Sequence, residues 1–468
     1  MNIKFELVEP ARRTPMSTPP SSAETAVPAG ASHSPDLAKV RAAVRGGTLA
    51  YFVDQFDIYL PIVVLAPATA YFQSANLSAS TTALLASLVF ASTLIGRPLG
   101  AVIFGHFADT VGRRKTTLVA VGGFGVITLL TACLPGHEQI GMWSVGLLIA
   151  LRFVDGIFLG GEYTTAVPLA MEWSPKHKRG LYASVITSTS PAAYAVIAAI
   201  TLLMLEMLPA AGLHSAYVQW GWRVPFVVGA LLAVVLFRYY LKQVHEPPVQ
   251  LTGEKHRLPL VRLLVKYPRA LGQVFVLMTG TWLATNMEAA VTPAQLKAHL
   301  LLSSKEVTLT MLVINASAAI SYPLFGLLSQ RIGRRPFYIG YGLAVVVIGS
   351  GAYTLLMVSH GGFGTALGFG VVIGVFTVGT FGPIAAYLTE RFPASIRSTG
   401  YGVGYSLALI APAFYQFYLQ RFDGVLPAHL APAVLLVVAG ALISLGGFLG
   451  PETKDVDMAD DRTIPALS

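Results

Sequence analysis

Apolar stretches of about 20 residues recur along this chain from Gly47 onward, and they constrain its fold more than any other feature. An α-helix needs about that length to cross the hydrocarbon core of a bilayer. Twelve such stretches begin near residues 47, 79, 117, 143, 180, 221, 269, 307, 337, 364, 400 and 430. Because backbone polar groups in hydrocarbon must be satisfied within their own segment, we expect helices rather than open strands.

The composition agrees with a membrane protein. Hydrophobic residues make up 54% of the chain and charged residues only 12%, whereas a soluble protein carries about 25% charged residues. The net charge of +9 comes from basic residues that lie between the apolar stretches, and no aromatic-basic nucleic-acid motif occurs. We therefore expect contact with the lipid bilayer and not with nucleic acid. The one cysteine, Cys133, excludes a disulfide framework and a cysteine-based zinc site.

The loops divide the predicted helices into two groups of six. Most of the 32 basic residues fall on one side of the membrane if both termini are cytoplasmic, as the positive-inside rule favours. The predicted units are a disordered cytoplasmic tail (1–45), an N-terminal six-helix half (46–241), a cytoplasmic linker (242–268), a C-terminal six-helix half (269–452) and a cytoplasmic tail (453–468).

An internal repeat relates the two halves. GHFADTVGRR at residues 105–114 matches GLLSQRIGRR at residues 326–335, and each lies between the second and third helices of its half. An E-x-x-P-x-x-x-R pattern follows the fourth helix of each half, at residues 172–179 and 390–397. Two landmarks in the same order support a duplication of a six-helix unit.

The first of these loops resembles the G-x-x-x-D-x-x-G-R-R/K motif of the major facilitator superfamily. The resemblance covers roughly residues 46 to 455, and RFVDGIFLGGEY, AAYLTERFPASIRSTGYGVGY and GPETK are most like the metabolite:proton symporter branch, which is related to sugar porters. It implies an all-α membrane protein with twelve transmembrane helices in two six-helix pseudo-repeats. Gln330 replaces the acid of the repeated loop, and KQVHEPP ends the sixth helix where sugar porters have P-E-S-P-R, which disfavours sugar transport.

The loop motif predicts a cytoplasmic gate. Asp109 can accept charge-assisted hydrogen bonds from a basic side chain or a helix amino terminus of the other half, which would favour the outward-facing state. Glu172 with Arg179, and Glu390 with Arg397, are expected to supply ionic partners on the same surface. The predicted gate residues are Gly105, Asp109, Gly112, Arg113, Arg114, Glu172, Arg179, Arg334, Arg335, Glu390 and Arg397. The alternative is that the basic residues only determine topology.

Charged residues inside two apolar stretches predict the coupling site. Asp54 and Asp57 share one face of the first helix, and Arg152 and Asp155 share one face of the fourth. Since a charge at mid-bilayer costs about 2.5–3.5 kcal/mol on insertion scales, these faces should meet water or each other. The resemblance implies that the first and fourth helices line the central cavity.

We therefore predict that Asp57 pairs with Arg152 across this cavity, as the matching residues of related proton-coupled carriers do. When substrate binding or the conformational change draws Arg152 away, desolvation favours protonation of the carboxylate. Asp155 either takes part in coupling or simply neutralises Arg152. The alternative for the whole group is an ion pair that only fixes helix packing.

The substrate is expected to contact both halves. Arg97 can hold a substrate carboxylate or balance Asp54, and Trp282 can stack on substrate or anchor the helix at the membrane interface. The predicted substrate contacts are Asp54, Arg97, Trp282, Asn286, Glu288 and Tyr387.

The sequence predicts a transporter rather than an enzyme. It contains no H-E-x-x-H spacing, no phosphate-binding G-x-x-x-x-G-K-S/T and no G-x-S-x-G elbow, so neither a cofactor nor a metal is expected. We predict a monomeric secondary active transporter that couples uptake of a small carboxylated metabolite to protons by alternating access, in the inner membrane if bacterial. The alternatives are a proton-antiport exporter of drugs or toxic metabolites and, more remotely, a membrane sensor that does not transport.

Overall fold

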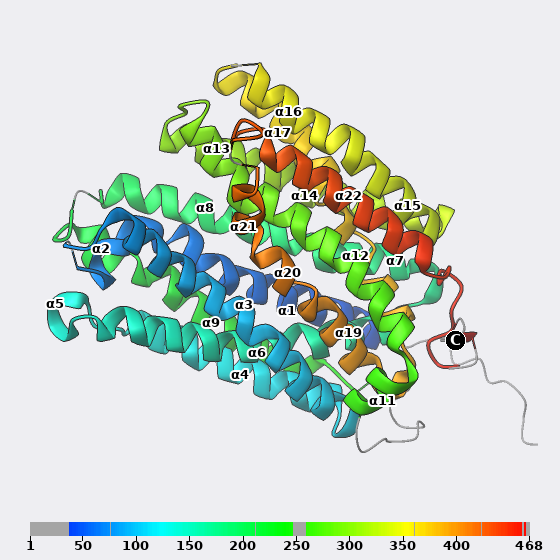
Figure 1. Ribbon diagram of the computed structural model, residues 1–468. Coiled ribbons are helices and arrows are strands. Elements are labelled where there is room, and N and C mark those ends of the chain that lie inside the picture. Colours follow the sequence, from blue (N-terminus) through cyan, green and yellow to red (C-terminus); the bar gives the residue numbers. More distant parts are fainter. Residues whose placement is uncertain are drawn as a thin grey trace, which may run out of the picture.

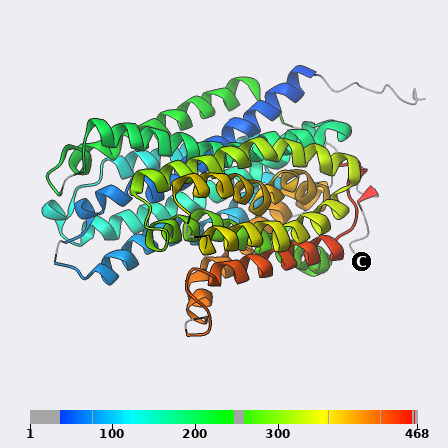
Figure 2. The ribbon, with the colours of Figure 1, turned by 90° about the horizontal axis from the view of Figure 1, so that it is seen from above.

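The structure of the protein is a computed structural model that describes residues 37–246 and 259–464, except residues 75, 211, 360, 423, 461 and 462. It is an all-α bundle, as predicted, in which the first half (blue to green) lies beside the second (green to red) (Figure 1). One end of the bundle carries the 105–114 loop. The first helix begins at this end, and the last described residues also lie there (Figures 1 and 2). We call this the motif end.

Helices of the first half follow the predicted order. The long ones are α1 (Leu37–Val63), α3 (Ala79–Thr110), α4 (Arg113–Ala132), α6 (Trp143–Trp173), α7 (Arg179–Thr187), α8 (Thr189–Met207) and α9 (Arg223–Gln243). Short α2 (Thr69–Phe72) and α5 (His137–Ile140) lie in the connections at the far end of the bundle.

The second half contains more interrupted helices. Its elements are α11 (Pro259–Lys266), α12 (Pro268–Asn286), η4 (Met287–Val291), α13 (Thr292–Ala298), α14 (Ser304–Ile332), α15 (Arg334–Ala344), η5 (Val345–Gly349), α16 (Ser350–Val358), α17 (Phe363–Thr377), η6 (Gly379–Phe381), α18 (Ile384–Glu390), α19 (Arg397–Leu407), α20 (Ile410–Ala413), α21 (Tyr415–Gln420) and α22 (Ala431–Leu449). Both η4 and η5 are π-helical turns, which often occur at functional sites.

Ten helical segments of the described chain are long and apolar enough to cross a membrane. α1 and the segment α19–α21 occupy the positions of the first and eleventh predicted spans. α1 is not among the ten, and it contains three strongly polar residues, Asp54, Gln55 and Asp57. The eleventh is divided, and α20 and α21 (orange) turn across the direction of the other helices (Figures 1 and 2). The twelve-helix fold class is thus accounted for.

The structure adds detail to three of the predicted units. α1 begins at Leu37, inside the predicted 1–45 tail, because Val40, Ala43 and Val44 bury an apolar face. The predicted linker contains α11. In the predicted 453–468 tail, Val456, Met458 and Ile464 join the central hydrophobic cluster. Residues 1–36 and 247–258, where disorder and part of the linker are predicted, lie outside the described residues.

Glycines let α3 and α6 pack backbone to backbone. A Cβ at Gly100 would lie 2.0 Å from the carbonyl oxygen of Ile157, and one at Gly156 would lie 2.1 Å from that of Thr93. At Gly160 the nearest atom would be the carbonyl oxygen of Arg97, at 2.3 Å. Small residues are the usual means of close approach between helices in membranes, where water does not drive them together. This contact fixes Arg97 of α3 against α6.

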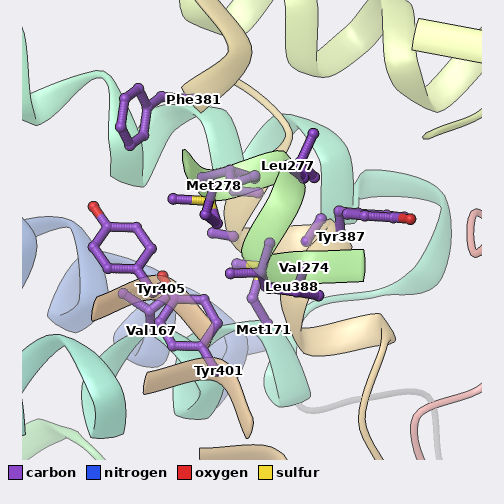
Figure 3. Packing of buried hydrophobic residues seen from close by; sticks show 14 of the residues in the cluster. Val167, Met171, Val274, Leu277, Met278, Phe381, Tyr387, Leu388, Tyr401 and Tyr405 are labelled. Atoms are coloured by element: carbon purple, nitrogen blue, oxygen red, sulfur yellow. The ribbon is translucent and has the colours of Figure 1, made fainter. Parts of the chain in front are cut away.

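A shared hydrophobic cluster joins the halves near the motif end. Figure 3 shows Val167 and Met171 of α6 packed with side chains from the second half. The other labelled members are Val274, Leu277, Met278, Phe381, Tyr387, Leu388, Tyr401 and Tyr405. The cluster lies between the central cavity described below and the polar contacts of the motif end.

Candidate functional site

A small, partly open cavity lies between the two halves. From the first half it is lined by α1 and α8, and from the second mainly by α12, η4, α14 and the region around η6. Its lining residues are Tyr51, Gln55, Tyr59, Ser190, Pro191, Trp282, Thr285, Glu288, Asn315, Tyr322, Val378, Phe381 and Tyr405. Trp282 and Glu288, two of the predicted substrate contacts, belong to this lining.

Asp54 and Arg97 form a buried ion pair beside this cavity. Arg97 Nη2 lies 3.2 Å from Asp54 Oδ2, and the side chains are 1% and 0% exposed. Gln55, which lines the cavity, donates from Nε2 to the same Oδ2 at 2.7 Å and accepts from Ser190 Oγ at 2.7 Å. Arg97 also lies over the ring of Tyr163, 4.6 Å from its centroid. The pair is thus connected to the cavity through Gln55.

A second buried group consists of two carboxylates, Asp57 and Asp155, and the guanidinium of Arg152 between them. We call these three residues the carboxylate triad. Arg152 Nη1 donates to Asp57 Oδ2 at 3.1 Å, and Arg152 Nη2 lies 3.0 Å from Asp155 Oδ2. Thr128 Oγ1 donates to Asp57 Oδ1 at 2.7 Å. Within the described residues, neither oxygen of Asp155 accepts a hydrogen bond. One guanidinium therefore faces two carboxylates, of which only Asp57 is stabilised by hydrogen bonds.

Glu162 adds a further buried acid on α6. It is 0% exposed, and neither carboxylate oxygen has a hydrogen-bond partner among the described residues. An isolated ionised carboxylate in an apolar interior is costly enough that it normally takes up a proton. No cluster of three His, Cys, Asp or Glu side chains suited to a metal ion occurs among the described residues.

At the motif end, Asp109 binds the amino terminus of a helix in the other half. Its carboxylate accepts from the backbone N–H of Ser398 at 3.1 Å and of Thr399 at 2.9 Å, and from Thr399 Oγ1 at 2.7 Å. Asp109 also lies 3.6 Å from Arg113 Nη2. Ser398 and Thr399 lie in the first turn of α19, where the free N–H groups and the helix dipole favour a negative charge.

The ionic contacts of the motif end cross between the halves. Glu172 contacts Arg113 of its own half and Arg397 of the other. Glu390 contacts Arg179 and Arg334, each at 3.2 Å. The expected partners of the two acids, Arg179 for Glu172 and Arg397 for Glu390, are thus exchanged. The exchange arises because the two halves face each other at the motif end, so that each acid reaches across the interface.

Gln330 occupies in the second half the place that Asp109 holds in the first. Its Oε1 accepts from the backbone N–H of Gly180 at 2.9 Å and from Arg334 Nη2 at 2.9 Å, and its Nε2 donates to Lys176 O at 3.3 Å. Gly180 lies in the first turn of α7. An uncharged amide therefore makes the repeated contact with a helix amino terminus.

Two further glutamates, which the sequence reading does not single out, complete the motif end. Glu246, within KQVHEPP, accepts from the backbone N–H groups of Arg113 and Arg114 at the start of α4. Glu452, within GPETK, accepts from those of Arg334 at 2.9 Å and Arg335 at 3.2 Å at the start of α15. Their matched positions after the sixth and twelfth predicted helices are a signal that could have identified them.

The two glycines of the first motif permit close contacts. A Cβ at Gly105 would meet the Cα of Thr399 at 3.0 Å, so a side chain there would push α19 away. Gly112 has φ +131°, a backbone conformation that other residues rarely adopt, and it lies against Glu246. Both glycines therefore serve the geometry of the motif end.

Asp54 and Arg97 lie beside the cavity but outside its lining, and two further predicted substrate contacts, Asn286 and Tyr387, also lie outside it. Asn286 donates from Nδ2 to Pro412 O at 2.9 Å. It cannot face the cavity together with Glu288, since residues two apart on a helix point in different directions. Tyr387 accepts from Gln273 Nε2 at 3.1 Å near Arg391, whose guanidinium pKa is lowered by burial.

The lining residues that the sequence reading omits are all uncharged. Gln55, Tyr59, Ser190, Thr285 and Tyr322 all line the cavity, but amides and hydroxyls within apolar helices are too common to single out. One spacing could have helped, because Trp282, Thr285 and Glu288 recur every three residues and share a helix face. That pattern separates Glu288 from Asn286.

Comparison with known proteins gives consistent matches. A family model described as Major Facilitator Superfamily matches residues 47–415. The inner membrane metabolite transport protein YhjE of Escherichia coli K12 is 32% identical over 394 residues, covering 82% of this chain and 87% of that protein. Alpha-ketoglutarate permease of the same organism is 29% identical over 420 residues, covering 86% and 92%.

A third relative and a solved structure extend the comparison. The proline/betaine transporter of Escherichia coli K12 is 26% identical over 439 residues, covering 90% of this chain and 85% of that protein. The proton:xylose symporter XylE, bound to 6-bromo-6-deoxy-D-glucose, matches with a TM-score of 0.73 and 18% identity over 89% of this chain and 97% of that one. The last match shows that the two chains share a fold.

Proposed function

The chain belongs to the Major Facilitator Superfamily, and from that premise we propose that it is a proton-coupled symporter that takes up a small carboxylated metabolite by alternating access. It is an integral, multi-pass transporter of the inner membrane, as its apolar helices and its relatives indicate. Direction, coupling ion and substrate are the parts of the proposal that go beyond the family.

The carboxylate triad is the observation that supports proton coupling. Two carboxylates share the single guanidinium of Arg152, so the group carries one excess negative charge when both are ionised. Burial disfavours that excess charge, and one bound proton removes it. Asp57 accepts hydrogen bonds from Thr128 and Arg152, whereas Asp155 accepts none among the described residues. We assign the resting proton to Asp155 and the ion pair to Asp57.

Transport then follows from the two ends of the bundle. The motif end is closed by contacts between the halves, and the cavity lies beyond it. With the motif end in the cytoplasm, as the positive-inside rule favours, this arrangement corresponds to a state closed toward the cell interior. Substrate binding and a proton on the triad would together permit the crossed ion pairs to separate, which opens the cavity inward.

Reconstitution tests the proposal. The full chain is placed in proteoliposomes containing a pH-sensitive dye and given 2-oxoglutarate, shikimate, L-proline or trimethylglycine, since relatives are named for compounds of these kinds. We expect at least one compound to enter together with protons and to accumulate under an inward proton gradient. Proton exit in exchange for substrate would establish antiport and overturn the proposal.

Variants locate the coupling. Asp57→Asn and Asp155→Asn are expected to retain counterflow of the transported compound while losing accumulation driven by the gradient. Glu206→Gln is the matched control, because Glu206 is 72% exposed and lies 3.5 Å from Lys305 far from the triad. If both aspartate variants still accumulated substrate, the triad would be a packing element only.

A further inference from the structure

We propose that the central cavity binds a substituted ammonium group, so that the transported metabolite is a zwitterion whose cationic end lies against Glu288. This inference rests on the proposed transport function, which leaves the charge of the substrate open. The ammonium group would be the ionic partner of Glu288, the one acidic side chain of the cavity lining.

Glu288 is placed in the cavity by the π-helical turn η4. Its side chain is buried, with 4% of the residue exposed, and it accepts a hydrogen bond from Asn315 Nδ2 at 3.4 Å. Asn315 directs the same Nδ2 to Met311 O at 3.0 Å, so its interaction with Glu288 is the weaker of the two. Among the described residues that line the cavity, none is basic. An acidic side chain within the membrane therefore faces the cavity without an ionic partner, an arrangement that marks a functional site. Its charged form is costly unless a cation lies beside it, and a substituted ammonium group would supply that cation.

Aromatic side chains make up half of the other lining residues. The aromatic lining residues are Tyr51, Tyr59, Trp282, Tyr322, Phe381 and Tyr405. Trp282 lies edge-on to Tyr405 at 5.1 Å and to Phe381 at 5.4 Å between ring centroids, and its Nε1 donates to Tyr405 O at 2.9 Å. These contacts hold the rings in fixed orientations. Aromatic faces beside a carboxylate are the environment that attracts a substituted ammonium, through the ring quadrupoles and the acid together.

The arginines near the cavity are already paired. Arg97 is bound by Asp54 and stacked on Tyr163, and Arg152 is shared by two aspartates. The carboxylate of the substrate would therefore meet uncharged groups of the lining, such as the hydroxyl of Tyr322. The one ionisable side chain of the lining that can carry a full charge near neutral pH is the acid Glu288. The protein should therefore distinguish between substrates mainly by their cationic end.

A pair of isosteres tests this inference. Trimethylglycine and 3,3-dimethylbutanoate have the same shape and the same carboxylate, but the second has a carbon atom in place of the positive nitrogen. Binding of each to the purified full chain in detergent is measured by titration calorimetry. We expect trimethylglycine to bind at least about tenfold more tightly, as a desolvated cation over aromatic rings beside a carboxylate requires. Equal or tighter binding of the carbon isostere, or no binding of trimethylglycine, would overturn the inference.

A variant then assigns the discrimination to Glu288. Glu288→Gln preserves the shape of the side chain and is expected to bring the two affinities within about twofold of each other. Glu206→Gln, the same change at an exposed site, should leave the ratio unchanged. A Glu288→Gln protein that still prefers trimethylglycine tenfold would show that the acid is not the ammonium partner. The wild-type comparison does not depend on how well this variant folds.

The outcome separates this inference from the proposed symport. If 2-oxoglutarate is accumulated with protons but the ammonium compound is not preferred, symport stands and the zwitterion inference fails. If trimethylglycine binds with the expected preference but no proton gradient drives its accumulation, the binding inference stands and symport fails.

Discussion

Glu172, near the end of α6, binds Arg397, the first residue of α19 in the opposite half. Glu390 binds Arg179 in the reverse sense, at 3.2 Å. Two copies of one sequence pattern have thus exchanged their ionic partners across the interface. The contacts that close the motif end are consequently contacts that must break when the halves separate.

Removing one member of such a pair should open the motif end. Glu172→Gln leaves Arg113 and Arg397 buried beside an uncharged amide, and loss of one partner of a buried pair costs about 3–5 kcal/mol. We expect the closed state to lose most of its population. Spin labels at Lys178 and Arg331, which are exposed on opposite halves, report this as a longer distance in a Cys133→Ser background.

The double variant distinguishes the pair from general damage. Combining Glu172→Gln with Arg397→Gln removes both charges, so the double variant should be less open than the sum of the single effects predicts. Additive effects would mean that Glu172 and Arg397 do not interact in the closed state.

Asp109→Asn should weaken the same closed state by a different route. The asparagine keeps one acceptor oxygen but loses the charge that Ser398, Thr399 and the α19 dipole stabilise. Since hydrogen bonds to a charged group contribute about 1.5–3 kcal/mol, the ratio of closed to open protein should fall about tenfold or more. The distance distribution between the same two labels measures it, and an unchanged distribution would contradict the assigned role of Asp109.

Gln330→Glu should have the opposite effect. A carboxylate at this position would accept from Gly180 and Arg334 with a full negative charge, whereas the amide now accepts as a neutral group. We expect a larger closed population and uptake slowed by a few-fold. The label distances and the initial rate of uptake should change together, and faster uptake with a more open motif end would disprove the prediction.

Gly156→Ala should destabilise the first half. Its Cβ would lie 2.1 Å from Thr93 O, a distance that forces α3 and α6 apart. Such overpacking costs about 1–3 kcal/mol, and a lower unfolding temperature of the purified protein would record it. Gly146→Ala is the control on the same helix, because a Cβ there has nothing within 4 Å. Equal unfolding temperatures for the two variants would show that α3 and α6 can move apart freely.

The helical fold could be predicted because it follows from the length and hydropathy of the apolar stretches. Each apolar stretch must satisfy its own backbone in hydrocarbon, so length and hydropathy alone locate the helices. Pro, Gly and polar residues decide where these helices are interrupted, and their effect depends on neighbours far away in sequence. The divided segment α19–α21 and the π-turn at Glu288 are therefore visible only in three dimensions.

The site was predictable where charge made it conspicuous. Asp57 and Arg152 stand out because charges within a membrane are rare, and the family resemblance supplied their proximity. The exchange of Glu172 and Glu390 between arginines was not predictable, because the repeated pattern offers each acid an equivalent arginine in either half. Tyr387 has the right residue type, but its helix carries it to the motif end, where it binds Gln273.

The glycine contacts between α3 and α6 also bear on how the molecule moves. At Gly100 and Gly160 the two backbones are so close that a shift of one helix along the other would drive side chains into carbonyl groups. Arg97 on α3 and Arg152 on α6 must then move together, as parts of one rigid body. The separation between these two arginines is therefore expected to be a constant of the transport cycle, and only what the opposite half presents to them changes.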